Sequence, residues 1–190
     1  MGKSYSYEDI ISEYTKALQR IDELTQAPED LFLLKPDSNT WSANEVFRHL
    51  RRFNNLYIRS IDQIEKGSQN NTVTKAQFKT SLPAGIIIRI MEPPYKLKIP
   101  TLAPMYPKAS AETGMQSTTA ELHETNQMAI ELLDEAESNS VDLDKIKGKH
   151  PVFKFIPMSL TDLFLVMAAH QRRHLWQAEQ TLYRLSGTRY

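Results

Sequence analysis

The chain has 190 residues, enough to bury a sizeable core, and we expect a single domain over residues 1–190. Its 23 basic and 23 acidic residues give a formal net charge of zero, so a nucleic-acid partner held by a broad basic field is not expected. The absence of cysteine excludes disulfides, thiolate metal ligands and a cysteine nucleophile.

The first predicted helix extends from about Tyr7 to Thr25. Its apolar residues recur three or four positions apart, which places them on one face of a helix. These residues are Ile10, Ile11, Tyr14, Leu18, Ile21 and Leu24. A helix with one apolar face must be covered by other elements, so this segment is expected to pack into a helical core.

The second predicted helix begins after Ser42. The pattern Ser42-x-x-Glu45 is a capping box, in which each side chain bonds to the backbone N–H of the other residue. Trp41 and Val46 flank this cap at the spacing of a hydrophobic staple. The apolar stripe then continues through Val46, His49, Leu50, Phe53, Leu56, Tyr57, Ile61 and Ile64. Gly67 favours a left-handed end to the helix.

Two long connections follow, separated by a short helix. Residues 66–80 are polar and are predicted to form a surface loop, whereas residues 82–91 are expected to form a short helix on the bundle. Residues 92–111 contain Pro93, Pro94, Pro100, Pro104 and Pro107. Because proline lacks an N–H and favours extended backbone, no helix is expected there. A long ordered loop in a compact domain is often functional.

The last two helices complete the predicted fold. One extends from about Thr118 to Glu137, and the other follows Pro157 with Ser159-x-x-Asp162 as its capping box. No segment alternates clearly over the length of a strand. Four amphipathic helices with a long crossover predict an all-α four-helix bundle with a proline-rich crossover loop.

No membrane segment or leader is expected. Residues 1–20 lack the continuous apolar stretch of a signal peptide, and the apolar run 86–88 is far too short to span a bilayer. The sequence therefore favours a cytoplasmic protein that does not contact a membrane.

Three histidines fall on the apolar stripes of two predicted helices. His170 and His174 are four residues apart, which places both imidazoles on one helix face, and His49 lies on the second helix. A lone histidine in such a position is usually a buried core residue that bonds to a carbonyl. One divalent cation would instead satisfy all three, because three neutral imidazoles and an open position make a catalytic zinc-type site. Imidazole also suits nickel, iron and copper.

Several residues near these histidines have a simpler explanation. The capping box accounts for Glu45 without a metal. Gln171 occupies the place of the glutamate in the His-Glu-x-x-His motif and cannot act as a general base, so a zincin-type protease is not expected. Gln177 lies on the inner face, where it either bonds to a ligand or is an ordinary helix-end amide.

The other charged residues are expected to lie away from the site. We expect His123 and Glu124 to face solvent, and His150, in a loop before a proline, to be a poor ligand. Arg172 and Arg173 are expected to point away from the histidine pair, toward solvent or a partner chain.

The last helix carries more apolar surface than one inward stripe can use. The surplus residues are Leu175, Trp176, Leu182, Tyr183 and Leu185. Some of them should meet the first helix or a second subunit, and a symmetric homodimer is the commonest closed assembly.

Two motifs resemble a known family. The run from Trp41 to Leu50, Trp-Ser-Ala-Asn-Glu-Val-Phe-Arg-His-Leu, resembles the Trp-Ser-x-x-Glu-Val-x-x-His-Leu signature of the DinB/YfiT-like superfamily. Residues 169–177 resemble its His-x-x-x-His segment on the last helix. The order and separation of the motifs also match. The resemblance implies a DinB-like four-helix bundle, often dimeric, with a divalent metal held by His49, His170 and His174.

The resemblance also implies a class of chemistry. Members of the superfamily include transferases that join a low-molecular-weight thiol, such as bacillithiol or mycothiol, to an electrophile, and a thiol-dependent isomerase. We therefore expect a metal-dependent enzyme that acts on a small-molecule substrate with a thiol cosubstrate. A metal-dependent hydrolase, a non-catalytic metal-binding or stress-related module, and a structural dimer with buried histidines are the alternatives.

Overall fold

The computed structural model describes residues 3–66, 77–94, 106 and 114–190. Its long helices are α1 (Tyr7–Leu24), α3 (Ala43–Lys66), α5 (Met115–Ser138) and α6 (Leu160–Ser186). Two shorter helices are α2 (Glu29–Leu33) and α4 (Leu82–Met91). Strand β1 (Ser4–Tyr5) pairs antiparallel with β2 (Phe78–Lys79), and β3 (Lys147–Lys149) pairs antiparallel with β4 (Pro157–Ser159).

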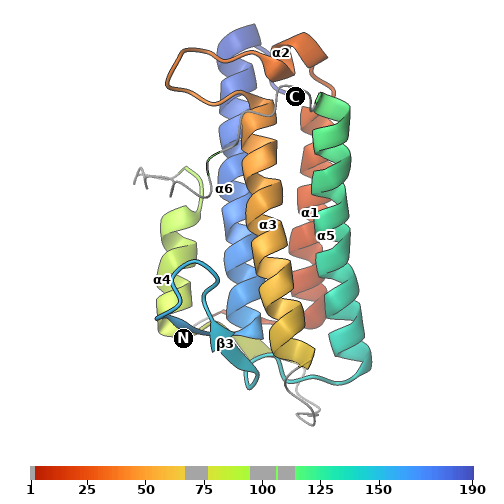
Figure 1. The fold of residues 1–190 in the computed structure, drawn as a ribbon, viewed down its shortest axis with the longest axis vertical. Helices are drawn as coiled ribbons and strands as arrows, with labels where there is room; N and C mark the ends of the chain where they lie inside the picture. Colours follow the sequence, from red (N-terminus) through yellow and green to blue (C-terminus); the bar gives the residue numbers. More distant parts are fainter. Residues whose placement is uncertain (1–2, 67–76, 95–105, 107–113) are drawn as a thin grey trace.

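The four long helices lie side by side along the long axis of the molecule (Figure 1). Helices α1 and α6 run in one direction, and α3 and α5 run in the other. Helix α4 lies outside this bundle and packs against α6, while α2 covers one end. The small sheets lie at the opposite end. The predicted all-α four-helix bundle is therefore confirmed.

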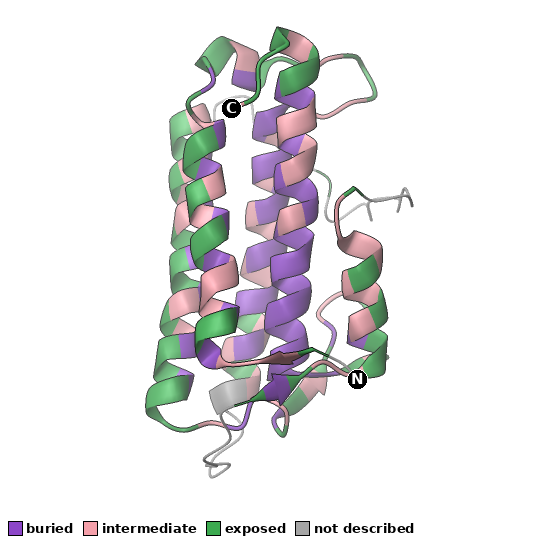
Figure 2. Ribbon diagram, turned by 180° about the vertical axis from the view of Figure 1, so that it is seen from behind, coloured by how far each residue is buried: buried purple, intermediate pink, exposed green. Residues whose placement is uncertain are grey.

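Helix α6 is the central element of the fold. It contacts α1, α3 and α4, and 18 of its 27 residues are buried. Figure 2 shows the buried residues concentrated on this helix, whereas α1 and α5 alternate between buried and exposed faces. A helix that is covered on several sides is apolar around most of its circumference. Side chains on more than one face of α6 are therefore held in place by packing.

The predicted helix starts agree with the structure. Ser42 Oγ accepts from the Glu45 N–H at 3.1 Å, and Glu45 Oε2 accepts from the Ser42 N–H at 2.9 Å. Ser159 and Asp162 form the same capping box at the start of α6. The short helix at residues 82–91 is also confirmed. The proposed end at Gly67 lies outside the described residues, as does most of the proline-rich segment.

Three features differ from the sequence-based expectation. Phe78 lies within the predicted polar surface loop, yet its side chain is fully buried and its ring contacts that of Tyr7 at a centroid distance of 4.9 Å. Helix α2 was not predicted, because five residues are too few to show a helical period. The β3–β4 hairpin was also missed. Each of its strands has three residues, too few for alternation to be recognised.

The buried apolar residues form two clusters along the bundle. One includes Phe53 of α3 and Ala168 of α6, and the other includes Leu50 of α3 and Leu175 of α6. The polar residues that separate them along α6 come from positions 170–174, so a buried polar layer lies between the two clusters. Within the described part of the chain, no helix combines the length and the apolar character needed to cross a membrane.

Candidate metal centre

Two helices position the three histidines in this polar layer. His49 comes from α3, whose start is set by its capping box, and His170 and His174 come from successive turns of α6. Their side chains are 3%, 6% and 8% exposed, respectively. Because α3 and α6 run antiparallel in contact, the imidazole of one helix reaches both imidazoles of the other.

The three rings converge on one point. His49 Nε2 and His170 Nε2 are 3.3 Å apart. The ring centroid of His174 lies 4.5 Å from that of His49 and 4.4 Å from that of His170. One ring nitrogen from each histidine lies within 4.8 Å of the other two. The sequence-based prediction that these residues come together is therefore confirmed, although their role as metal ligands stays a prediction.

Burial keeps the rings of His170 and His174 neutral. It lowers the pKa of His170 well below the usual value, and the neighbouring His174 and His49 lower it further. Burial likewise lowers the pKa of His174, followed by the effect of His49, against a smaller opposing effect of Gln177. Since only a neutral imidazole offers a lone pair to a metal, both residues are in the form that binds a cation.

Hydrogen bonds orient the nitrogens for this role. His174 Nδ1 and Gln177 Oε1 are 2.8 Å apart. Because an amide oxygen only accepts, Nδ1 carries the proton and the Nε2 lone pair of His174 is available. Gln177 is thus a hydrogen-bond partner of a histidine, a role that differs from both alternatives left open by the sequence, a bond to a ligand and an ordinary helix-end amide. Such a partner is typical of the residues that orient metal ligands.

The donor set fits a divalent cation. A single proton between the Nε2 atoms of His49 and His170, 3.3 Å apart, makes one of them a donor and the other an acceptor, whereas with both protons on Nδ1 the two Nε2 lone pairs face each other. His170 Nδ1 is buried and has no hydrogen-bond partner among the described residues. A cation would accept both Nε2 lone pairs in the second arrangement, and three imidazoles suit zinc, nickel, iron or copper.

The remaining acidic and histidine candidates lie elsewhere. Glu45 is used by the capping box and by Lys35, whose Nζ lies 3.3 Å away. Glu124 is exposed, and His123 is partly exposed, with its Nε2 2.9 Å from an Asp22 carboxylate oxygen. These expectations are confirmed.

His150 is not a member of the cluster, but it is not a solvent-exposed loop residue either. It is 3% exposed, and its Nδ1 accepts from the backbone N–H groups of Val152 and Phe153 at 3.0 Å. The other nitrogen, Nε2, lies 2.9 Å from the Tyr57 hydroxyl and must carry the proton. Burial lowers the pKa of His150 to about 4.

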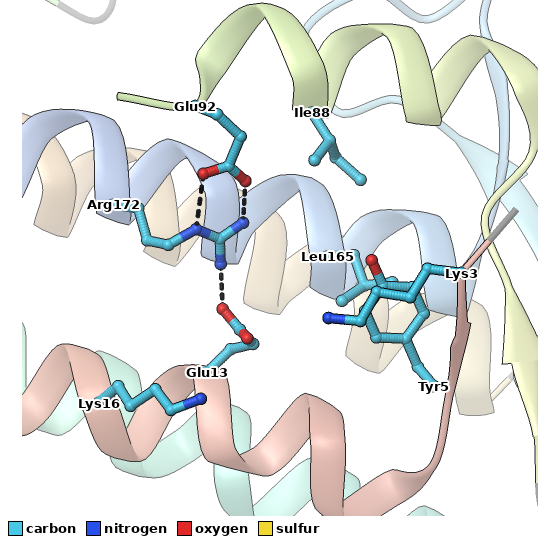
Figure 3. A pocket seen from close by; sticks show the side chains of 8 residues that line it. All are labelled: Lys3, Tyr5, Glu13, Lys16, Ile88, Glu92, Leu165 and Arg172. Atoms are coloured by element: carbon cyan, nitrogen blue, oxygen red, sulfur yellow. Dashed lines mark hydrogen bonds and ion pairs between the residues drawn. The ribbon is translucent and has the colours of Figure 1, made fainter. Parts of the chain in front are cut away.

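The expectation that the two arginines point away from the histidine pair agrees with their contacts, but the expectation that they face solvent was wrong. Arg173 is only 6% exposed, and its Nη1 donates to the Ile90 carbonyl at 3.3 Å. Arg172 bridges Glu92, at the end of α4, and Glu13 of α1 (Figure 3). Helix α4 packs against α6, and residues at its end contact both arginines, so neither arginine points freely into solvent.

Arg172 also lines a cavity of about 330 Å³ between α1, α4 and α6 (Figure 3). Its apolar wall includes Leu165 and Ile88, and Lys3 and Lys16 extend over it. Three of the five N–H donors of Arg172 are used by the two glutamates, so this cluster ties three helices together. None of the three histidines lines this cavity.

The sequence analysis missed the aromatic residues around the histidines. Phe53 stacks on His170, with a centroid distance of 3.5 Å and an angle of 10° between the rings. Trp41 was recognised only as a staple residue, yet its ring lies beside those of His49 and His174. The one available signal was the occurrence of Phe53 on the same apolar stripe as His49, one turn later.

Comparison with known proteins identifies one family. A family model described as the DinB superfamily matches residues 13–178, a range that includes all three histidines and most of the four long helices. No curated protein and no solved structure matches the chain.

Proposed function

The chain belongs to the DinB superfamily, and on that basis we propose that it is a metal-dependent enzyme of the thiol-using transferase type. His49, His170 and His174 would hold one divalent cation, with zinc or nickel as the first candidates and iron or copper as the others. The observation that carries the proposal is the convergence of three buried imidazoles, one nitrogen from each lying within 4.8 Å of the others.

A divalent cation bound by three neutral imidazoles supplies Lewis acidity, which polarises an electrophile or lowers the pKa of a thiol or water that binds it. The chain's own residues prepare the site for it. Burial keeps His170 and His174 neutral, Gln177 fixes the proton of His174 on Nδ1, and Phe53 holds the ring of His170 by stacking.

In a thiol transfer, the chain cannot supply the nucleophilic thiol from its own side chains. The chain has no cysteine, so the nucleophilic sulfur belongs to a low-molecular-weight thiol cosubstrate. Transfer forms a carbon–sulfur bond between that thiol and the small-molecule electrophile. The leaving group departs with its bonding electrons, and the thiol proton is released to solvent.

A non-catalytic metal-binding module is the second candidate. Among the described residues, the group that could hold a metal ion consists of the three histidines and includes no carboxylate. A hydrolase generally needs a general base within hydrogen-bond reach of its nucleophile, and this group does not supply one. That observation favours the module over the hydrolase.

The first experiment measures metal content. Protein purified without a metal-affinity tag and dialysed against zinc should contain about one ion per chain by elemental analysis. His170→Ala should lose the ion. His123→Ala is the matched control, because His123 is partly exposed and contacts Asp22 rather than the cluster. A wild-type protein that binds no divalent ion would refute the proposal.

The second experiment measures turnover. The metal-loaded protein is incubated with a low-molecular-weight thiol and a panel of carbon electrophiles, and loss of thiol and formation of the thioether are followed. Turnover that disappears in His170→Ala and persists in His123→Ala supports a transferase. Stoichiometric metal binding without turnover of any pair supports the non-catalytic module.

The proposal extends to location and assembly. We propose a cytoplasmic homodimer with a small-molecule substrate. The apolar surplus on the last helix is smaller than the sequence indicated, since Leu175 and Leu182 are buried within the single chain. Tyr183 remains 45% exposed, and Trp176 and Leu185 are partly exposed, so these three residues of the predicted surplus could contact a second copy. Light scattering at micromolar concentration distinguishes a dimer from a monomer.

A further inference from the structure

The rings around the three histidines differ in exposure from one side of the cluster to the other. On one side Phe53, which is 5% exposed, stacks on His170. The ring of Phe53 in turn stacks on the fully buried Tyr57, with a centroid distance of 4.4 Å. This side of the cluster is therefore closed by the apolar core.

The other side carries aromatic surface that is not buried. The indole of Trp41 lies nearly parallel to the ring of His174, at 6.4 Å and 24°, and its centroid is 5.1 Å from that of His49. Tyr106 meets the same indole edge-on at 6.1 Å. Trp41 is partly exposed, Tyr106 is 51% exposed, and His174, the ring stacked on Trp41, is the most exposed of the three histidines.

We infer that Trp41 and Tyr106 form an aromatic wall of the metal centre, and that this wall binds a flat, aromatic or conjugated part of the substrate. The inference rests on the proposed function, because it assumes that the histidines hold a cation on which the substrate is centred. Trp41 is then a specificity-determining residue, in contact with the substrate rather than with the reacting bond.

Trp41 is held rigidly enough for this role. It directly precedes Ser42, the buried N-cap residue of α3, and its carbonyl accepts from Thr181 Oγ1 of α6 at 3.4 Å. Its side chain packs against the apolar cluster that includes Leu50. The anchored backbone keeps the ring in position without the substrate, so little ordering entropy is lost when a ligand stacks on it.

The chemistry of the site favours a flat neutral or anionic group. Aromatic rings prefer offset-stacked or edge-to-face contacts, and the indole offers the largest such surface of any side chain. A cationic group is also attracted to an indole face. However, a divalent cation on the adjacent histidines would repel it.

The alternative explanation is that Trp41 acts only as a hydrophobic-staple residue that packs against the start of α3. It is tested with two probes that share a metal-binding head and differ in the tail: benzohydroxamate, which is flat, and cyclohexanecarbohydroxamate, which is puckered and of similar size. Their dissociation constants are measured by calorimetry on the zinc-loaded protein, after zinc content has been determined separately.

The wild-type protein should bind the flat probe more tightly by roughly three- to tenfold, the range expected for one aromatic contact. Trp41→Leu should bring the ratio close to one and leave the affinity for the puckered probe within about twofold. Trp41→Phe should retain part of the preference. If Trp41→Leu does not fold, Tyr106→Ala replaces it, because that side chain is largely exposed.

The two tryptophans provide a second readout. In Trp176→Phe the single remaining tryptophan is Trp41, and its fluorescence should change when benzohydroxamate binds. In Trp41→Phe the single tryptophan is Trp176, and its fluorescence should not change. Trp176→Phe should keep the full preference for the flat probe.

Equal affinities for the two probes in wild-type protein, or a preference that survives Trp41→Leu unchanged, would overturn the aromatic wall while leaving the metal centre intact. A protein that binds no zinc would overturn the proposed function, and this inference with it. The separate zinc measurement therefore distinguishes the two failures.

Discussion

The contact between Gln177 and His174 allows a sharp test of the metal centre. Replacing Gln177 with Leu removes the only atom shown to accept a proton from His174 Nδ1, at 2.8 Å, and keeps a side chain of similar size. Without that acceptor, the imidazole is free to rotate and to place its proton on Nε2, where the lone pair is needed. Binding a metal must then reverse both changes.

The structure separates the effect on metal binding from the effect on stability. Loss of a partner that orients a ligand typically lowers metal affinity 10- to 100-fold, which is about 1.4–2.7 kcal/mol. Loss of one hydrogen bond at a partly exposed side chain costs the metal-free protein only about 0.5–1 kcal/mol. We therefore expect zinc affinity to fall much more than the free energy of unfolding.

Zinc affinity is measured by competition with a chromophoric chelator, and stability by urea denaturation in the presence of a strong chelator. Gln180→Leu is the matched control, since Gln180 lies one turn further along the same helix, outside the three-histidine cluster. Gln177→Glu retains an acceptor and should bind zinc at least as tightly as wild type. A zinc affinity of Gln177→Leu within twofold of that of Gln180→Leu would refute the assigned role.

Three further predictions test the stability of the fold. Because the pKa of His150 is lowered to about 4 in the folded protein and is near 6.5 in the unfolded chain, the unfolded chain binds more protons between these values and stability falls as pH falls. Wild type should lose about 2 kcal/mol more than His150→Gln between pH 7 and pH 4.5 by urea denaturation, and parallel losses would contradict this. Arg172→Gln should lower the free energy of unfolding by about 1 kcal/mol, because the carboxylates of Glu13 and Glu92 then lose the cation that they share. Arg184→Gln, at an exposed ion pair, is the control and should change this free energy by less than about 0.5 kcal/mol. Equal effects of the two substitutions would contradict the role of Arg172 in joining the three helices. Zinc at 100 times its dissociation constant should add about 2.7 kcal/mol to wild type, reversed by chelator, and the same gain in His170→Ala would show that zinc binds elsewhere.

The elements of the fold were largely predictable because their signals are local. The periodicity of α1 and α5, and the capping boxes at Ser42 and Ser159, involve residues no more than a few positions apart. The pairing of His170 with His174 is local in the same way, since four residues make about one helical turn. The place of His49 opposite them followed from the apolar stripe that it shares with Leu50 and Phe53.

The tertiary structure decided which faces of the central helix are covered, and with them the surroundings of the site. A helical period shows which residues share a face. It does not show that α4 packs against α6, where residues at the end of α4 contact Arg172 and Arg173. Likewise, the approach of Trp41 to His174 and the burial of His150 against Tyr57 join segments more than 90 positions apart. The apolar stripes and the capping boxes describe each helix alone. The contacts of Trp41 and His150 depend on how several helices pack together, because residues of neighbouring helices supply the burial that shifts a pKa or orients a ring.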